Sequence, residues 1–311
     1  MRRALSACRL AVWASALQAI LWTPSASGAE GVSGTSVARA TARHRLAAVK
    51  LWGCQYQNID LARIAASPLD LVVIEPIVDG AIGRAATREE IAALKTKPDG
   101  GTRLVVAYLS VGAAEEYRPY WRAAWKEGSR PKWLGEESSE WPRSYSVRYW
   151  EPEWRAIVAD AWMQLVRAGY DGVFLDRVDA FHDWRDSRGT GQADMVDLVA
   201  ELGRLAREVN PAFLIIGQNA EQLLLDRRYI DVIDAVSKES LLTGLRGEQL
   251  SNSREDIEWS LSYLLPAKAA GLTILSIEYL RDRPLIDRAA REHESYGFVP
   301  FFATRLLDRL P

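Results

Sequence analysis

Short apolar runs alternate with longer helical patterns along most of this chain, from Val49 onward. Several runs are nearly continuous Val, Ile and Leu, which is typical of parallel strands that are covered on both faces. The runs predict eight strands, at Lys50–Gly53, Leu69–Ile74, Arg103–Leu109, Gly172–Leu175, Phe213–Gly217, Val232–Val236, Thr273–Ile277 and Phe298–Phe301.

The stretches between these runs predict helices, among them Arg88–Lys95, Pro152–Ala168, Ala193–Val209 and Arg254–Ala270. Thr87 and Glu90 form a capping box at one helix start, and Gly169 and Gly271 stand where two helices should end. Eight strands with intervening helices in about 260 residues is the pattern of a (β/α)8 TIM barrel. We therefore expect an α/β chain whose residues 47–311 form one barrel domain.

A doubly wound open sheet is the runner-up fold. Such sheets usually carry a glycine-rich phosphate loop after the first strand. Here the first strand continues into Trp52-Gly53-Cys54-Gln55-Tyr56, which is no such loop, so the barrel is favoured.

The N-terminus differs from the rest of the chain. Residues 1–29 combine a basic start, a short apolar run and small residues before Glu30, the order of a secretory signal peptide. An uncleaved anchor helix is the alternative, but the apolar run is too short to span a membrane comfortably. Residues 30–46 predict a flexible lead-in. We expect a secreted or periplasmic protein with no transmembrane segment after cleavage.

Composition narrows the possible partners. The net charge of −2 gives no reason to expect nucleic acid as a partner. After signal cleavage Cys54 is the one remaining cysteine, and a buried bystander is favoured over a nucleophile. The three histidines, His44, His182 and His293, are scattered, which argues against a histidine-based metal site.

Polar and aromatic residues collect where the predicted strands end. In a parallel barrel these ends share one face, the face that carries function. Carboxylates recur at four of seven strand ends, although the barrel does not need them there for stability. Salt bridges to Arg177, Lys238 or Arg281 are the alternative explanation. The strand-end candidates are Trp52, Tyr56, Glu75, Asp79, Tyr108, Asp176, Asp179, Gln218, Asn219, Glu239, Glu278 and Tyr279.

Asp176 and Glu239 are the strongest catalytic candidates. Asp176 is delivered by the tip of the apolar strand Gly172–Leu175, and Glu239 closes the strand next but one. Two carboxyl groups that face each other over a cleft are the minimum equipment for glycoside hydrolysis, since one donates a proton and the other attacks or activates water.

The chain has 12 tryptophans, many of them between the third and fourth strands. Aromatic faces suit the apolar faces of sugar rings, although most tryptophans belong to protein cores. We expect two or three to contact a sugar, with Trp52 and Trp141 the best placed.

The chain resembles the glycoside hydrolase family 114-like proteins, the barrels of the endo-α-1,4-polygalactosaminidase type. The resemblance runs in order from about Trp52 to Phe301. It rests on Leu71–Glu75, Val106–Glu115, Gly172–Asp179, Gly217–Ala220, Ser237–Ser240 and Gly297–Pro300. Each motif is modest alone, and together they are specific.

This resemblance implies a (β/α)8 fold, export, no cofactor, and endo-hydrolysis of an α-linked polysaccharide that contains galactosamine. The family's catalytic pair falls on Asp176 and Glu239. By analogy with other retaining barrels, we expect Asp176 to be the nucleophile and Glu239 the general acid/base. Deacetylated galactosamine carries an ammonium group, which an acidic mouth would attract. We therefore expect the side chains of Glu75, Asp79, Asp179 and Glu278 to bind the amino groups of the polymer. Glu75 and Glu278 stand where the family usually has Asp.

Two other function classes compete with a hydrolase. A non-catalytic sugar-binding barrel of the cell envelope or matrix would keep aromatic platforms but would not need the facing pair Asp176 and Glu239. A metal-dependent deacetylase would need clustered His and Asp ligands. The carboxylate pair favours the hydrolase.

Overall fold

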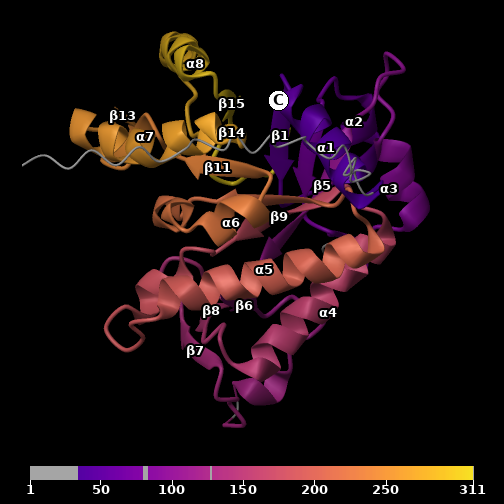
Figure 1. Ribbon diagram of the computed structural model, residues 1–311, viewed down its shortest axis with the longest axis vertical. Coiled ribbons are helices and arrows are strands. Elements are labelled where there is room, and N and C mark those ends of the chain that lie inside the picture. Colours follow the sequence, from indigo (N-terminus) through magenta and orange to yellow (C-terminus); the bar gives the residue numbers. More distant parts are fainter. Residues whose placement is uncertain (1–33, 80–82, 127, 311) are drawn as a thin grey trace, which may run out of the picture. The chain divides into compact units, whose positions relative to one another are not determined.

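The computed structural model describes residues 34–79, 83–126 and 128–310, without the side chain of Asp79. The predicted signal peptide, 1–29, lies outside these residues. Eight strands form one parallel sheet (Figure 1), and all eight expected strands are confirmed, with bounds that differ by up to three residues. They are β1 (Trp52–Gln55), β2 (Leu71–Ile74), β5 (Leu104–Ser110), β9 (Gly172–Asp176), β10 (Leu214–Gln218), β11 (Ala235–Glu239), β14 (Thr273–Glu278) and β15 (Val299–Phe302).

Each strand pairs in parallel with its neighbour in that order. The first and last strands meet through the Trp52 indole, whose Nε1 donates to the Val299 carbonyl oxygen at 2.8 Å. The sheet is therefore a nearly closed barrel, as expected from the sequence.

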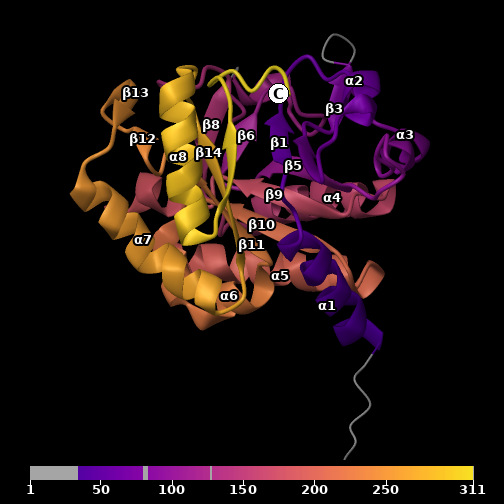
Figure 2. The same cartoon turned by 90° about the horizontal axis from the view of Figure 1, so that it is seen from above.

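A helix lies between each pair of consecutive barrel strands. Figure 2 shows these helices around the sheet. They are α2 (Leu61–Ala66), α3 (Arg88–Leu94), α4 (Pro152–Ala168), α5 (Gly191–Val209), α6 (Arg227–Val232), α7 (Arg254–Ala269) and α8 (Arg283–Tyr296). The capping box is confirmed at α3, where Thr87 and Glu90 exchange hydrogen bonds, and Gly169 and Gly271 adopt positive φ at two helix ends. Among the described helices, none is both long and apolar enough to cross a membrane.

Strand pleating divides the core into two parts. Alternate residues such as Val73, Phe174, Ile216 and Ile277 fill the barrel interior. Their neighbours along each strand pack outward against the helices in a second, larger cluster. Because successive side chains point to opposite faces, this alternation decides which strand-end residues reach the mouth.

The flexible lead-in expected at 30–46 is wrong from Gly34 onward, where α1 (Gly34–Ala47) begins. Ala42 and Leu46, four residues apart on one helix face, are buried with the barrel interior. The Arg39 Nε atom donates to Asp234 Oδ1 at 3.1 Å. Asp234 precedes β11, so α1 covers the end of the barrel where the strands begin (Figure 2).

The opposite end is built up by short elements that follow the strands. They are β3 (Ile77–Asp79), β4 (Arg84–Ala85), β6 (Ala113–Glu115), η1 (Ala123–Trp125), β7 (Leu134–Glu137), β8 (Ser144–Val147), η2 (Ala180–Trp184), η3 (Glu221–Leu225), β12 (Thr243–Gly244) and β13 (Gly247–Ser251). Strands β6, β8 and β7 form a small antiparallel sheet after β5. These additions surround the carboxyl ends of the strands, where the site candidates lie.

Candidate active site

The pleat places one set of strand-end residues over the barrel interior. Asp176 lies two residues beyond the inward-facing Phe174, and Gln218 two beyond Ile216. The same spacing turns Tyr56, Glu75, Tyr108, Glu239 and Tyr279 inward. Seven of the expected site residues therefore share the inward-facing register of the mouth.

Two hydrogen bonds hold the Asp176 carboxylate. The Tyr108 hydroxyl donates to Oδ2 at 2.6 Å, and the Arg177 backbone N–H donates to Oδ1 at 2.8 Å. Arg177 reaches this position with φ +60°, a conformation that non-glycine residues adopt at a cost. The carboxylate is half-buried and is fixed by a rigid strand end.

The Glu239 carboxylate lies across β10 from Asp176. It accepts hydrogen bonds from Gln218 Nε2 at 3.1 Å, from Asn219 Nδ2 at 3.5 Å, and from the Tyr279 hydroxyl. The Asn219 Oδ1 atom accepts the Glu239 backbone N–H at 3.0 Å, which fixes the same pair of residues a second time. Each carboxylate of the candidate pair is thus held by one tyrosine hydroxyl.

Cys54 of β1 belongs to the barrel interior, and Tyr56, two residues further along the chain, packs against it. The rings of Tyr56 and Tyr108 lie 4.5 Å apart. Burial raises the pKa of the Tyr56 phenol, and the negative charge of Asp176 raises it further. Burial also raises the pKa of the Cys54 thiol, and Glu239 adds to this effect. Both carboxylates therefore act on one central group of residues, and the protonated thiol fits a bystander better than a nucleophile.

Glu75 faces the mouth but is engaged by a residue that the sequence analysis missed. Arg118 Nη1 and Nη2 donate to its two carboxylate oxygens at 2.6 and 3.0 Å, and both side chains are buried. Burial raises the pKa of the Glu75 carboxyl, whereas the Arg118 guanidinium acts in the opposite direction. The guanidinium also lies 5.7 Å from the centre of the Tyr108 ring. Glu75 thus holds the Arg118 guanidinium beside Tyr108. Because its carboxylate is already paired with Arg118, the expected contact with a substrate amino group does not fit this arrangement.

Glu278 also departs from its expected position. It is the last residue of β14, it points outward, and 0% of its surface is accessible. Its carboxylate accepts hydrogen bonds from Leu242, Thr243 and His293. A substrate amino group cannot reach it, so the expectation for Glu278 is wrong.

The two expected tryptophan platforms have different surroundings. Trp52 is 2% exposed and packs on Phe301 inside the barrel at 5.6 Å, so it is core and the expected sugar contact is wrong. Trp141 is 62% exposed in the turn between β7 and β8, and its contact with a sugar stays a prediction.

Asp179 remains a candidate for an amino-group contact. Its carboxyl group is half-buried, and its Oδ1 atom lies 4.0 Å from Arg177 Nε. Burial raises the pKa of this carboxyl, Arg177 opposes the rise, and Asp176 adds to it. The negative charge of Asp176 therefore acts on the Asp179 carboxyl group. Asp79 belongs to β3, and its side chain lies outside the described part of the structure.

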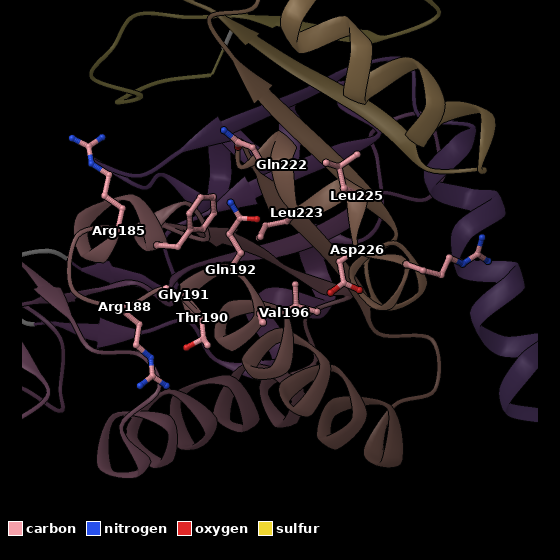
Figure 3. Close-up of a pocket in the computed structure, with 14 residues that line it drawn as sticks. Arg185, Arg188, Thr190, Gly191, Gln192, Val196, Gln222, Leu223, Leu225 and Asp226 are labelled. Carbon is pink, nitrogen blue, oxygen red and sulfur yellow. The ribbon is translucent and has the colours of Figure 1, made fainter.

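A cavity of about 750 Å³ lies between η2, the start of α5 and the end of η3 (Figure 3). Arg185, Arg188 and Arg227 line it, and neither Asp176 nor Glu239 does. Arg188 is paired with Asp194 at 2.7 Å and Arg227 with Asp231 at 2.8 Å. The candidate active site is therefore assigned from the positions of the carboxylates of Asp176 and Glu239, and not from this cavity.

Within residues 34–79, 83–126 and 128–310, no three His, Cys, Asp or Glu side chains are grouped so that they could hold a metal ion. His293 is buried between Glu278 and Ser276, and His182 packs on Phe181. The clustered ligands that a metal-dependent deacetylase needs are not found in this part of the chain.

Known sequences are similar to this chain over most of its length. A model of glycoside-hydrolase family GH114 matches residues 35–310. An uncharacterized protein of Deinococcus radiodurans is 35% identical over 268 residues, 85% of this chain and 83% of that protein. An uncharacterized protein of Methanocaldococcus jannaschii is 32% identical over 273 residues, 84% of this chain and 78% of its own length.

Two solved structures share the fold. The glycoside hydrolase domain of PelA from Pseudomonas aeruginosa is 24% identical, with a TM-score of 0.66 over 84% of this chain and 97% of that one. Ega3 from Aspergillus fumigatus, in a complex with galactosamine, is 18% identical, with a TM-score of 0.63 over 84% of this chain and 93% of that one.

Proposed function

The chain belongs to glycoside hydrolase family GH114, and from this we propose that it is an endo-acting hydrolase of an α-linked, galactosamine-containing polysaccharide. One observation carries the proposal: inward-facing Asp176 and Glu239 end β9 and β11, and a tyrosine hydroxyl holds each. A non-catalytic sugar-binding barrel has no use for such a pair, so the enzyme is favoured over that alternative.

In the proposed mechanism Glu239 first donates a proton to the glycosidic oxygen. Asp176 attacks the anomeric carbon as the leaving sugar departs, which forms a glycosyl ester. Glu239, now a carboxylate, takes a proton from water, and the resulting hydroxide displaces Asp176. The donors on Glu239 from Gln218, Asn219 and Tyr279 suit the carboxylate that exists after proton delivery.

Galactosamine is proposed as the sugar on two grounds. The solved structure of the related Ega3 contains galactosamine. In addition, an ammonium group near Asp176 and Glu239 would meet an acidic site. The Asp179 side chain is accessible, and we propose it as the contact for this ammonium group. Glu75 and Glu278 are engaged elsewhere and are not part of this proposal.

The proposed activity is tested by incubating the purified mature protein with polymers of galactosamine and of N-acetylgalactosamine. We expect a ladder of oligosaccharides from the polymer with free amino groups, because an endo-enzyme cuts internal bonds. Release of monosaccharide alone would argue against endo-action. Depolymerisation of only the acetylated polymer would argue against ammonium recognition.

We also propose that the protein is exported, because residues 1–29 have the order of a signal peptide. The expected result is a secreted or periplasmic protein whose first residue lies near Glu30. N-terminal sequencing of the protein from culture medium and periplasm measures this. A chain that starts at Met1 in the membrane fraction would instead support the anchor.

A further inference from the structure

Glu278 of β14 and His293 of α8 form a buried acid–base pair on the outward-facing side of the barrel sheet. The side chains of Glu278 and His293 are both 0% accessible. His293 Nε2 lies 3.1 Å from Glu278 Oε1, and His293 Nδ1 lies 3.2 Å from the Ser276 hydroxyl, which orients the ring. A carboxylate this deeply buried is costly unless its oxygens are fully hydrogen-bonded.

The Glu278 carboxylate meets that requirement through the loop that follows Glu239. Oε1 accepts the Leu242 N–H at 2.8 Å as well as the bond from His293. Oε2 accepts the Thr243 N–H at 3.1 Å and the Thr243 hydroxyl at 2.6 Å. Each oxygen therefore has two donors, which is the full capacity of a carboxylate.

Three consecutive residues of the β14 end hold this loop. The Ile277 carbonyl accepts the Ser240 N–H at 2.8 Å, Glu278 binds residues 242 and 243, and the Tyr279 hydroxyl donates to Glu239. Ser240 has φ +54°, a strained conformation that persists only when its surroundings enforce it. The loop that follows Glu239 is thus held by Glu278, next to Tyr279, whose hydroxyl donates to the Glu239 carboxylate.

We propose that Glu278 and His293 are positioning residues, which fix the loop 240–243 and through it the Glu239 carboxyl group. Neither side chain touches the mouth, so they act on the reaction only through Glu239. The inference rests on the proposed function, because it needs Glu239 to be the proton donor.

The Glu278→Gln variant should lower kcat on the galactosamine polymer about 10- to 100-fold, since small displacements of a reacting group carry penalties of this size. The amide turns an NH2 group toward one pair of donors, so the hydrogen bonds on that side of Glu278 are lost. KM should stay within about threefold, because the substrate-contacting groups remain in place. Thr243→Val removes the loop hydroxyl that donates to Glu278 and should lower kcat severalfold.

A second readout separates misplacement of a proton donor from general loosening. A nitrophenyl glycoside of a short galactosamine oligomer has a leaving group that needs little protonation. If Glu278 acts through Glu239, kcat/KM should fall for the polymer and change much less for the nitrophenyl substrate. His293→Gln, which keeps a hydrogen-bond donor, should retain more activity than His293→Leu.

Asp234→Asn is the matched control. Asp234 is an equally buried carboxylate that directly precedes β11, at the opposite end of that strand from Glu239, and it accepts bonds from Arg39, from Arg207 and from the Ile215 N–H. The Asp234→Asn variant should lose thermal stability, and its kcat/KM should change equally for the polymer and for the nitrophenyl substrate.

If wild-type protein leaves the polymer intact, the proposed function and this inference both fail. If wild-type protein is active, and Glu278→Gln and Thr243→Val behave like Asp234→Asn, this inference alone is overturned. Should Glu278→Gln not fold, Thr243→Val and the His293 variants decide.

Discussion

The Asp176→Asn variant should lose polymer hydrolysis almost completely, with kcat lowered by at least about 10³-fold. The change keeps the shape of the side chain and removes the attacking oxygen's charge, so no glycosyl ester can form. The hydroxyl of Tyr108 still finds an acceptor in the amide oxygen, so the fold should persist. Steady-state kinetics on the polymer, together with a thermal melting curve, measure both effects.

Asp171→Asn provides the control on the same strand. Asp171 precedes β9 at the opposite end of the barrel, where it accepts bonds from Lys95 Nζ and from the Val105 N–H, both at 2.9 Å. This variant should melt at a lower temperature and keep kcat within about twofold, because it is remote from the mouth. If Asp176→Asn retains kcat within tenfold of wild type, Asp176 is not the nucleophile.

The Glu239→Gln variant should show a different pattern of loss. Its kcat/KM on the polymer should fall about 10²- to 10⁴-fold, the usual contribution of general acid catalysis. On the nitrophenyl glycoside kcat/KM should fall far less, because that leaving group departs without a proton. Asp176→Asn, by contrast, should be inactive on both substrates. Equal losses of Glu239→Gln on the two substrates would contradict its role as the acid.

The strand positions could be predicted from the sequence because their cause is local. A parallel strand covered on both faces is a run of Val, Ile and Leu, as Leu71–Ile74 and Leu104–Ser110 illustrate. The α3 capping box could be predicted for the same reason, since Thr87 and Glu90 interact across one helical turn.

The direction of individual side chains could not be predicted in the same way. A strand that is apolar on both faces has no alternation, so the sequence does not reveal which residues point inward. Glu278 and Tyr279 are neighbours at one strand end, yet one contacts α8 and the other holds Glu239. The expectation was right in placing both at the strand end and wrong in giving both to the substrate.

Partners from distant loops were also hidden from the sequence. Arg118 is 43 positions from Glu75, and nothing in the local pattern joins them. The α1 helix was missed because its Gly-, Ser- and Arg-containing composition is typical of linkers, whereas Leu46 and the pair of Arg39 with Asp234 anchor it to the barrel. In both cases tertiary contacts outweigh local composition.

The most direct test of the two-carboxylate mechanism is the anomeric configuration of fresh product, followed by NMR during hydrolysis of an α-linked galactosamine polymer. Direct attack by Asp176 and then by water inverts the anomeric carbon twice. The account therefore predicts that new reducing ends appear first as the α-anomer and convert to the β-anomer only by mutarotation. A β-anomer that appears first would contradict the account and would make Asp176 a base that activates water.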